Sequence, residues 1–319
     1  MIHFSTLWLY PSPSDCRYRP VEPGDRRLLP VPDEDMGRVT QMYAEISKED
    51  LTRYRVDGRP CRVQVTHAVS GTCYILRAMS DNLPPLVDLG LATPIIREIM
   101  APGLTGLVLI AGPQGSGKTT LAAAMVRERI KQYGGAAQVI EDPPELDLDG
   151  VHGAGVIQQI DVRSVTDVPD NDRVAWLAAD ALRSDTDIIF LGEVRRPGEA
   201  ETVVSQAAVG ALVVTTIHAL GVDTAVERLI SLAGGHMDNE AESMTASALA
   251  IVLHLDLSTQ PVRGGESVKV LRVQPLIIRG QQEHGIRSAI RSKRYPELRS
   301  ASQLQATQMT TGRYPQADR

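Results

Sequence analysis

The residues best suited to chemistry are three glycines, a lysine and a threonine in the segment Gly112–Thr119, which reads GPQGSGKT. Their spacing matches the phosphate-binding P-loop pattern G-x-x-x-x-G-K-[ST]. Glycines let such a loop turn with positive φ and bring backbone N–H groups onto phosphate oxygens. The helix that follows directs the positive end of its dipole at the same anion. The segment therefore predicts a nucleoside triphosphate site.

Each polar residue of this loop has an expected role. We expect Lys118 to neutralise the β- and γ-phosphates and the Thr119 hydroxyl to bind Mg²⁺. The predicted nucleotide-binding residues are Gly112, Pro113, Gln114, Gly115, Ser116, Gly117, Lys118, Thr119 and Thr120.

Three further polar segments follow apolar runs. Asp187–Glu193 (DIIFLGE) is an apolar strand pattern ending in an acid, and the carboxyl ends of parallel strands are where ligands sit, so Glu193 is predicted to act at Mg²⁺. Ile140–Glu145 (IEDPPE) offers a carboxylate to orient an attacking water, but it also suits a simple acidic turn. His218, after Thr-Thr-Ile, suits either a structural histidine or a group that senses phosphate.

Composition excludes several classes of protein. The 319 residues contain no apolar run long enough for a transmembrane helix, and the apolar start lacks the basic region of a signal peptide. Cys16, Cys61 and Cys73 give neither a disulfide framework nor a four-cysteine zinc site, so a reducing cytoplasm is expected. The net charge of −6 argues against direct nucleic-acid binding. Residues 261–319 nevertheless carry 11 basic and 4 acidic side chains.

The order of the patterns predicts two domains. Residues 1–32 hold six prolines and are predicted to be irregular. Residues 33–102 form an α+β domain with a helix at 33–51, a hairpin turning at Ser70-Gly71 and a short helix at 93–100. A boundary is expected near 101–103. Residues 281–319 have little apolar periodicity and are predicted to be a basic, flexible tail.

Between these parts, residues 103–280 alternate strands with helices. Predicted strands lie at 107–111, 137–140, 188–191, 211–217 and 268–276, and predicted helices at 119–131, 172–183, 198–208, 223–232 and 240–253. Short apolar strands alternating with helices indicate a parallel sheet covered on both faces. The predicted class is a doubly wound α/β fold.

Four motifs in this order, GPQGSGKT, IEDPPE, IIFLGEVR and TTIHA, together resemble the secretion ATPase superfamily and its PilT-like branch. This family drives type II secretion, type IV pili and type IV secretion, and the resemblance covers roughly Arg26–Leu276. It implies a RecA-like P-loop domain and a smaller PAS-like α+β N-terminal domain. It also implies an ATP- and Mg²⁺-dependent homohexamer, cytoplasmic and peripheral at the inner face of the bacterial inner membrane, which docks on a membrane platform.

The resemblance also implies residue roles. Glu145 would be the general base, Glu193 would act at the Mg²⁺ side and His218 would read the γ-phosphate. Arg62 and Arg77 of the hairpin would stabilise the transferred phosphoryl group, although both also suit plain exposed hairpin arginines.

Some positions depart from the family pattern. The helix before IIFLGEVR contains Arg183, but Ala179 stands at the earlier position of the usual arginine pair, and Ser70 stands at a usual hairpin arginine. The family's first N-terminal strand is not visible in Met1–Cys16. No cysteine follows Cys73, which disfavours the zinc-containing assembly ATPases. The VRRPG run after Glu193 is most similar to the DotB- and TraJ-like ATPases of type IVB secretion and conjugative transfer. A pilus retraction ATPase, a DNA translocase and a non-hydrolysing nucleotide-binding regulator remain alternatives.

Overall fold

The computed structural model describes residues 3–21, 27–49, 51–79, 83–237, 240–261 and 267–315. The chain divides into two compact units. The first takes in Met1–Asn82 and Pro143–Asp147, and the second takes in Leu83–Asp142 and Leu148–Arg319. No helix among the described residues is long and apolar enough to cross a lipid bilayer.

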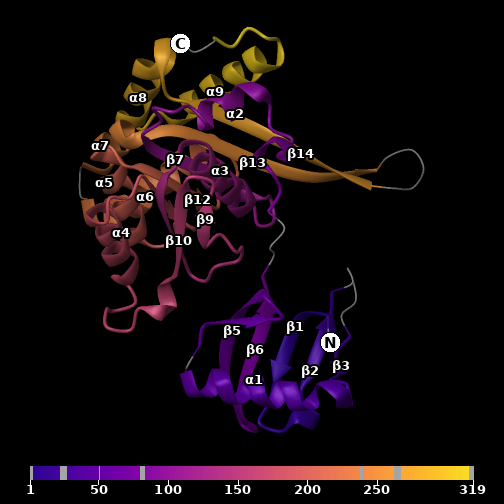
Figure 1. Ribbon diagram of the computed structural model, residues 1–319. Coiled ribbons are helices and arrows are strands. Elements are labelled where there is room, and N and C mark those ends of the chain that lie inside the picture. The colour runs from indigo at the N-terminus through magenta and orange to yellow at the C-terminus, as the bar shows by residue number, and fades with distance from the viewer. Residues whose placement is uncertain are drawn as a thin grey trace. The chain divides into compact units, whose positions relative to one another are not determined.

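The first unit is a six-stranded antiparallel sheet with one helix packed on it (Figure 1). Its elements are β1 (Phe4–Leu9), β2 (Arg17–Pro20), β3 (Leu29–Pro30), α1 (Met36–Glu49), β4 (Arg53–Val56), β5 (Arg59–Ala68) and β6 (Gly71–Ala78). The strand order is β3-β2-β1-β6-β5-β4. The α1 side chains Val39, Met42 and Ile46 recur at helical spacing and share one core with Leu7 and Leu76 of the sheet.

The prediction of an irregular segment over residues 1–32 is wrong. β1 lies inside the sheet, paired with β2 on one side and with β6 on the other. Pro11 and Pro13 fall in the connection after β1, while Pro20 and Pro30 are the last residues of β2 and β3. Prolines are tolerated in connections, at edge strands and beside bulges, so those at these places do not prevent strand formation.

The second unit is built on an eight-stranded sheet (Figure 1). Its strands are β7 (Gly106–Ala111), β8 (Gly135–Glu141), β9 (Gly150–His152), β10 (Gly155–Asp161), β11 (Ile188–Leu191), β12 (Leu212–Ile217), β13 (Leu249–Pro261) and β14 (Ser267–Ile277). Their order is β14-β13-β7-β12-β11-β8-β10-β9. The six inner strands are parallel, and β14 and β9 pair antiparallel at the edges.

Helices cover both faces of this sheet, as the doubly wound class predicts (Figure 1). They are α2 (Thr93–Ile99), α3 (Lys118–Tyr133), α4 (Arg173–Arg183), α5 (Pro197–Ala208), α6 (Val222–Met237), α7 (Ala241–Ala248), α8 (Glu283–Arg291) and α9 (Tyr295–Thr310). Leu107 and Leu109 of β7 pack into the core shared with α4, α5 and α6. Side chains alternate along a strand, so Val108 and Ile110 point to the other face. β7 therefore lies in the middle of the second unit, with side chains packed on both faces of the sheet.

The boundary between the units lies before Leu83, earlier than the predicted position at 101–103. The segment containing α2 belongs to the second unit because α3 holds its backbone. Arg127 donates to the Leu83 carbonyl at 2.8 Å, and Arg129, itself buried, donates to the Ile99 carbonyl at 2.9 Å. Backbone carbonyls held by charged donors fix this segment against the P-loop helix.

The C-terminal residues also differ from the prediction. Instead of a flexible tail over 281–319, the described residues form α8 and α9, and Leu298 and Met309 are buried. The amide of Gln305 accepts from the Ile277 N–H at 2.7 Å and donates to its carbonyl at 2.9 Å. Gln305 thereby satisfies both backbone groups of Ile277, the last residue of β14. An inward-facing polar residue explains why apolar periodicity did not reveal α9.

Two smaller differences lie in the second unit. The helix predicted at 240–253 ends at Ala248, and Leu249–Leu253 (LAIVL) instead runs parallel to β7. β9 and β10 occupy a region in which no strand was predicted.

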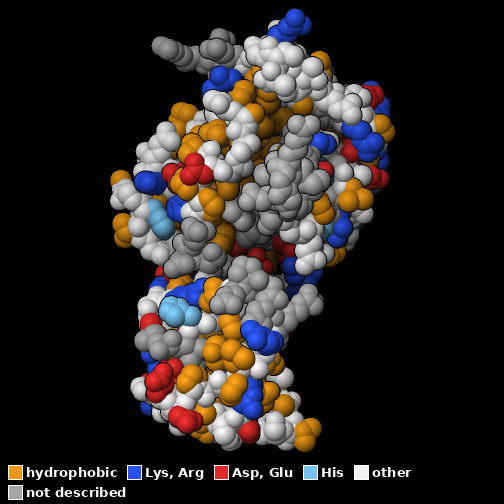
Figure 2. All heavy atoms as spheres, turned by 90° about the vertical axis from the view of Figure 1, so that its right-hand side faces the viewer, with side chains coloured by type: hydrophobic (Ala, Val, Ile, Leu, Met, Phe, Trp, Pro, Cys, Tyr) orange, Lys and Arg blue, Asp and Glu red, His pale blue; other side chains and the backbone are white. Residues whose placement is uncertain are grey.

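On the face drawn in Figure 2, Lys and Arg side chains are interspersed with Asp and Glu over the described surface of the second unit.

Candidate functional site

The loop between β7 and α3 has the backbone that the P-loop pattern requires. Gly115 and Gly117 have φ of 75° and 90°, in the left-handed region that favours glycine. A Cβ on Gly112 would lie 2.4 Å from the Leu255 carbonyl oxygen, so only glycine fits there. Gly117 is the N-cap of α3 and has no side chain to occupy the first-turn N–H groups. These groups are thus left to an anion.

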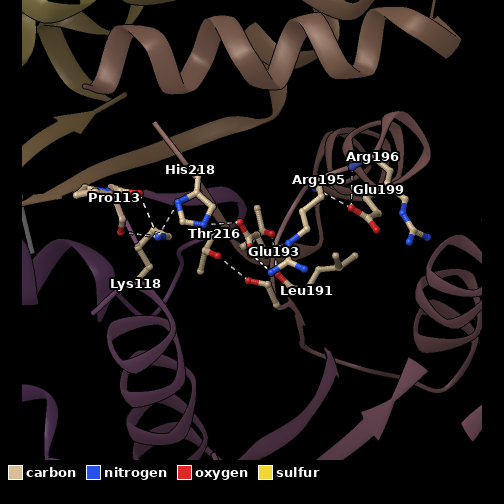
Figure 3. Close-up of polar contacts among 12 residues, drawn as sticks. Pro113, Lys118, Leu191, Glu193, Arg195, Arg196, Glu199, Thr216 and His218 are labelled. Carbon is tan, nitrogen blue, oxygen red and sulfur yellow. Dashed lines mark hydrogen bonds and ion pairs between the residues drawn. The ribbon is translucent and has the colours of Figure 1, made fainter. Parts of the chain in front are cut away.

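Lys118 is the first residue of α3 and lies across this loop. Its side chain is only 7% exposed, and Nζ donates to the carbonyls of Gly112 at 3.0 Å and Pro113 at 2.9 Å. Nζ is also 3.5 Å from Nδ1 of His218, which follows β12 (Figure 3). The predicted phosphate-binding lysine and the predicted phosphate-sensing histidine are therefore neighbours.

Glu193 continues this chain of polar contacts. It follows β11, and its Oε1 lies 3.1 Å from His218 Nε2 without the alignment of a hydrogen bond (Figure 3). Arg195 donates to Oε2 through Nε at 2.8 Å and through NH2 at 2.5 Å, and these bonds raise the pKa of the Arg195 guanidinium above its usual value. The structure thus brings together three of the predicted site residues: Lys118, His218 and Glu193.

Arg195 was missed as a contact of the site. Its signal was the VRRPG run after Glu193, which was used only to choose a branch of the family. The same run begins α5: the backbone N–H groups of Arg195 and Arg196 both donate to the Glu199 carboxylate, at 2.7 and 2.9 Å (Figure 3). This capping arrangement fixes the turn that carries Arg195.

The two threonines before His218 hold the end of the Glu193 strand. Thr215 donates to the Leu191 carbonyl at 2.6 Å and Thr216 to the Gly192 carbonyl at 2.7 Å, and both threonines are buried. Their role in the structure is therefore to tie β12 to the end of β11. This fixes the spacing between Glu193 and His218.

The predicted Mg²⁺ ligands suit a hard cation that is shared with phosphates. Among the described residues, no group of three or more His, Cys, Asp or Glu side chains could hold a metal by itself. Mg²⁺ at phosphates, however, needs only one or two protein oxygens, and a hydroxyl and a carboxylate are suitable. Glu193 Oε1 is buried and accepts no hydrogen bond in the described structure. Thr119 lies half-buried in the first turn of α3.

The acidic IEDPPE segment is divided between the units. Glu141, at the end of β8, is buried and accepts a hydrogen bond from Gln159 at 2.7 Å. Glu145 belongs to the piece Pro143–Asp147, which clusters with the first unit, and its side chain is exposed. Its role as general base stays a prediction.

Arg62 and Arg77 lie directly opposite each other on β5 and β6 of the first unit. Arg62 is also opposite Arg53 on β4, so three arginines share one row on one face of the sheet. Like charges placed opposite each other are destabilising unless an anion compensates them. Arg53 of this row already pairs with the Asp147 carboxylate at 3.2 Å, so part of the compensating charge comes from the chain itself. The catalytic role of Arg62 and Arg77 stays a prediction.

Comparison with known proteins identifies the family. The family model described as "Type II/IV secretion system protein" matches residues 45–293. This is most of the chain and includes all four motifs, so the chain belongs to this family of secretion and pilus ATPases.

Individual relatives support the same conclusion. The chain is 28% identical over 305 residues to a "Twitching motility protein" of Neisseria gonorrhoeae, covering 90% of this chain and 76% of the relative. It is 33% identical over 156 residues to the "Type IV pilus ATPase PilU" of Pseudomonas aeruginosa, covering 49% of this chain and 38% of the relative. It thus spans less than half of PilU.

Solved structures agree in fold. The retraction motor PilT with bound ADP superposes with a TM-score of 0.73 at 24% identity, covering 96% of this chain and 88% of that one. The Legionella pneumophila ATPase DotB gives 0.69 at 18% identity, covering 99% and 90%. At these identities the likeness shows a common fold, which confirms the predicted RecA-like class.

Proposed function

We propose that this chain is a Mg²⁺-dependent, ATP-hydrolysing motor that works as a homohexamer in a type IV secretion or conjugative transfer machine. Its expected place is the cytoplasmic face of the bacterial inner membrane, docked on a membrane platform. Family membership supports the ATPase activity. The observation that carries the proposal is the contact chain from Lys118 through His218 to Glu193. It joins the ends of three adjacent parallel strands, where α/β sheets bind ligands.

In the proposed mechanism, Lys118 and the first-turn N–H groups of α3 bind the β- and γ-phosphates. Phosphate oxygens would replace the Gly112 and Pro113 carbonyls as acceptors for the ammonium group. Thr119 and Glu193 would hold Mg²⁺, which when bound neutralises charge on the β- and γ-phosphate oxygens.

His218 is suited to report the γ-phosphate because it lies between a phosphate-binding group and a metal-side group. Its Nδ1 faces Lys118 and its Nε2 faces Glu193, so a shift of either neighbour changes its contacts. We assign the general base to Glu145, which would accept the proton of the attacking water. Arg62 and Arg77 would stabilise charge on the transferred phosphoryl group.

The proposed catalytic residues come from both units. Lys118, Glu193 and His218 belong to the second unit, whereas Arg62, Arg77 and Glu145 belong to the first. If hydrolysis requires all of them, both units take part in each round of nucleotide binding and release. In the proposed homohexamer, a closed ring would allow head-to-tail contacts between subunits to repeat without forming an open filament.

A second candidate is a type IV pilus retraction ATPase. It is favoured by the gonococcal twitching motility protein, which aligns with 90% of the chain. Disruption of the gene, scored for conjugation and for surface motility together, separates the two. We expect conjugation to fall and native protein, but not Lys118→Ala, to restore it. Loss of motility alone would assign the chain to a pilus.

The enzymatic proposal is tested by ATP turnover per protomer as a function of protein concentration. We expect turnover to rise with concentration, because neighbouring subunits of the proposed homohexamer would complete each other's sites. Glu145→Gln should still bind ATP but turn it over at least about 10²-fold more slowly, the scale of a lost general base. Glu34→Gln, an exposed acid of the same unit, is the matched control. Unchanged turnover in Glu145→Gln would move the base to another acid.

A further inference from the structure

His254 is a buried histidine that none of the four motifs contains. It lies on β13, directly beside Ala111, the last residue of β7. The next residue, Leu255, provides the carbonyl that crowds Gly112. His254 is thus the neighbour, on the adjacent strand, of the point at which the P-loop begins.

The surroundings of His254 do not explain its burial. The side chain is only 6% exposed, and neither ring nitrogen makes a hydrogen bond within the described part of the chain. The Ala219 backbone acts to raise the pKa of the ring, but no aligned hydrogen bond joins the two among the described residues. Buried polar groups are nearly always paired, so an unpaired imidazole calls for an explanation.

Ala219 directly follows His218 and begins the turn that leads into α6. The far end of this turn is anchored, because Asp223 in the first turn of α6 accepts a hydrogen bond from Arg299 of α9 at 2.6 Å. The near end carries His218, whose ring reaches Lys118 and Glu193. A hydrogen bond from His254 to Ala219 would therefore fix the end of the turn at which the γ-phosphate is read.

We propose that His254 is a positioning residue for the turn of residues 218–221, holding His218 against the γ-phosphate by donating its ring N–H to the Ala219 carbonyl. This inference rests on the proposed ATPase function. No aligned bond is present in the described structure, so we expect it to form when nucleotide orders the turn. His254 touches neither substrate nor metal in this assignment and acts through His218.

The charge state of the ring agrees with this role. Burial, the largest effect, lowers the pKa of His254, and Lys118 lowers it further. The Ala219 backbone, Asp256 and Asp223 act in the opposite direction. Burial prevails, so the imidazole is neutral near pH 7 and has one N–H to donate.

The test compares His254→Leu and His254→Gln with native protein in the full chain. We expect His254→Leu to lower kcat about tenfold, the scale of one hydrogen bond, with ATP affinity within about twofold. His254→Gln keeps an N–H donor and should recover most of the rate. Thr245→Val is the control and should retain native turnover, because it removes a different buried polar group, a hydroxyl of α7 that has no hydrogen-bond partner among the described residues.

A second readout does not depend on turnover. A non-hydrolysable ATP analogue should slow hydrogen exchange of the 218–221 amides in native protein, and this protection should be lost in His254→Leu but kept in Thr245→Val. Protection retained in His254→Leu would overturn the inference. A native protein that never hydrolyses ATP but shows this pattern would refute the ATPase proposal while leaving the positioning role of His254 intact.

Discussion

The P-loop end of the second unit and the arginine face of the first unit solve the placement of charge in different ways. At the P-loop end, each charged group has a partner nearby: Lys118 has loop carbonyls, and Glu193 has Arg195 and His218. On the first unit, Arg62 lies opposite two other arginines in the sheet, and one of these, Arg53, pairs with the Asp147 carboxylate from outside the sheet. The first region is preorganised within one unit, whereas the second is suited to an anion from outside the sheet.

This difference predicts which step, ATP binding or ATP hydrolysis, each region should control. The groups proposed to bind phosphates all belong to the P-loop end, so we expect binding to need the second unit alone. The arginine row and Glu145 belong to the first unit and should matter only for turnover. Substitutions in the two regions are therefore expected to separate binding from hydrolysis.

The largest effect is expected for Lys118→Ala. Removing the ammonium group leaves the phosphates without their main cation, so turnover should fall about 10²-fold or more and ATP affinity should fall with it. Both are measured with purified protein, by phosphate release and by titration with a fluorescent ATP analogue. Lys131→Ala, an exposed lysine near the end of the same helix, is the control. Normal hydrolysis by Lys118→Ala would show that the site is elsewhere.

Arg77→Gln should have a smaller and different effect. Arginines that stabilise a transferred phosphoryl group raise the rate by up to about 10³–10⁵-fold. Because several arginines of the row would share this stabilisation, we expect Arg77→Gln to lower kcat by about 10–10²-fold. ATP affinity should stay within about twofold of native, since the P-loop is intact. Arg291→Gln, an exposed arginine of the second unit, controls for loss of charge. If Arg77→Gln weakens ATP binding as strongly as turnover, the proposed division of labour between the regions fails.

The smallest effect concerns pH and the burial of His254. Its folded-state pKa lies below the ordinary 6.5, so the unfolded chain takes up a proton first as pH falls. Native stability should therefore decrease below pH 6.5, and His254→Leu should not share this loss. As pH falls, we expect the free energy of unfolding of His254→Leu, relative to that of native protein, to rise by up to about 1.4 kcal/mol per pH unit. Urea unfolding from pH 7.5 to 5.5, with Thr245→Val for comparison, measures it. A pH-independent difference would mean that His254 is not held in its neutral form.

Most of the local patterns that predicted the second unit were confirmed, because each lies within one continuous segment. The P-loop, its strand and its helix occupy consecutive residues, and the predicted strand at 188–191 matches β11. Where a pattern depends on a distant partner it failed. β1 was hidden by the prolines around it, and α9 was hidden because Gln305 faces inward to satisfy the backbone of Ile277.

The amino-acid sequence by itself determined the phosphate loop, the alternation of strands and helices and the order of the four motifs. Only the tertiary structure decided which strands became neighbours. The chain order is β7, β8, β11, β12, yet β12 lies between β7 and β11 in the sheet, and this places His218 between Lys118 and Glu193. Hydrophobic periodicity specifies which residues are buried, but the crossovers that set strand order depend on packing between segments far apart in sequence. For the same reason, the burial of His254 beside the P-loop emerges only once β13 has paired with β7.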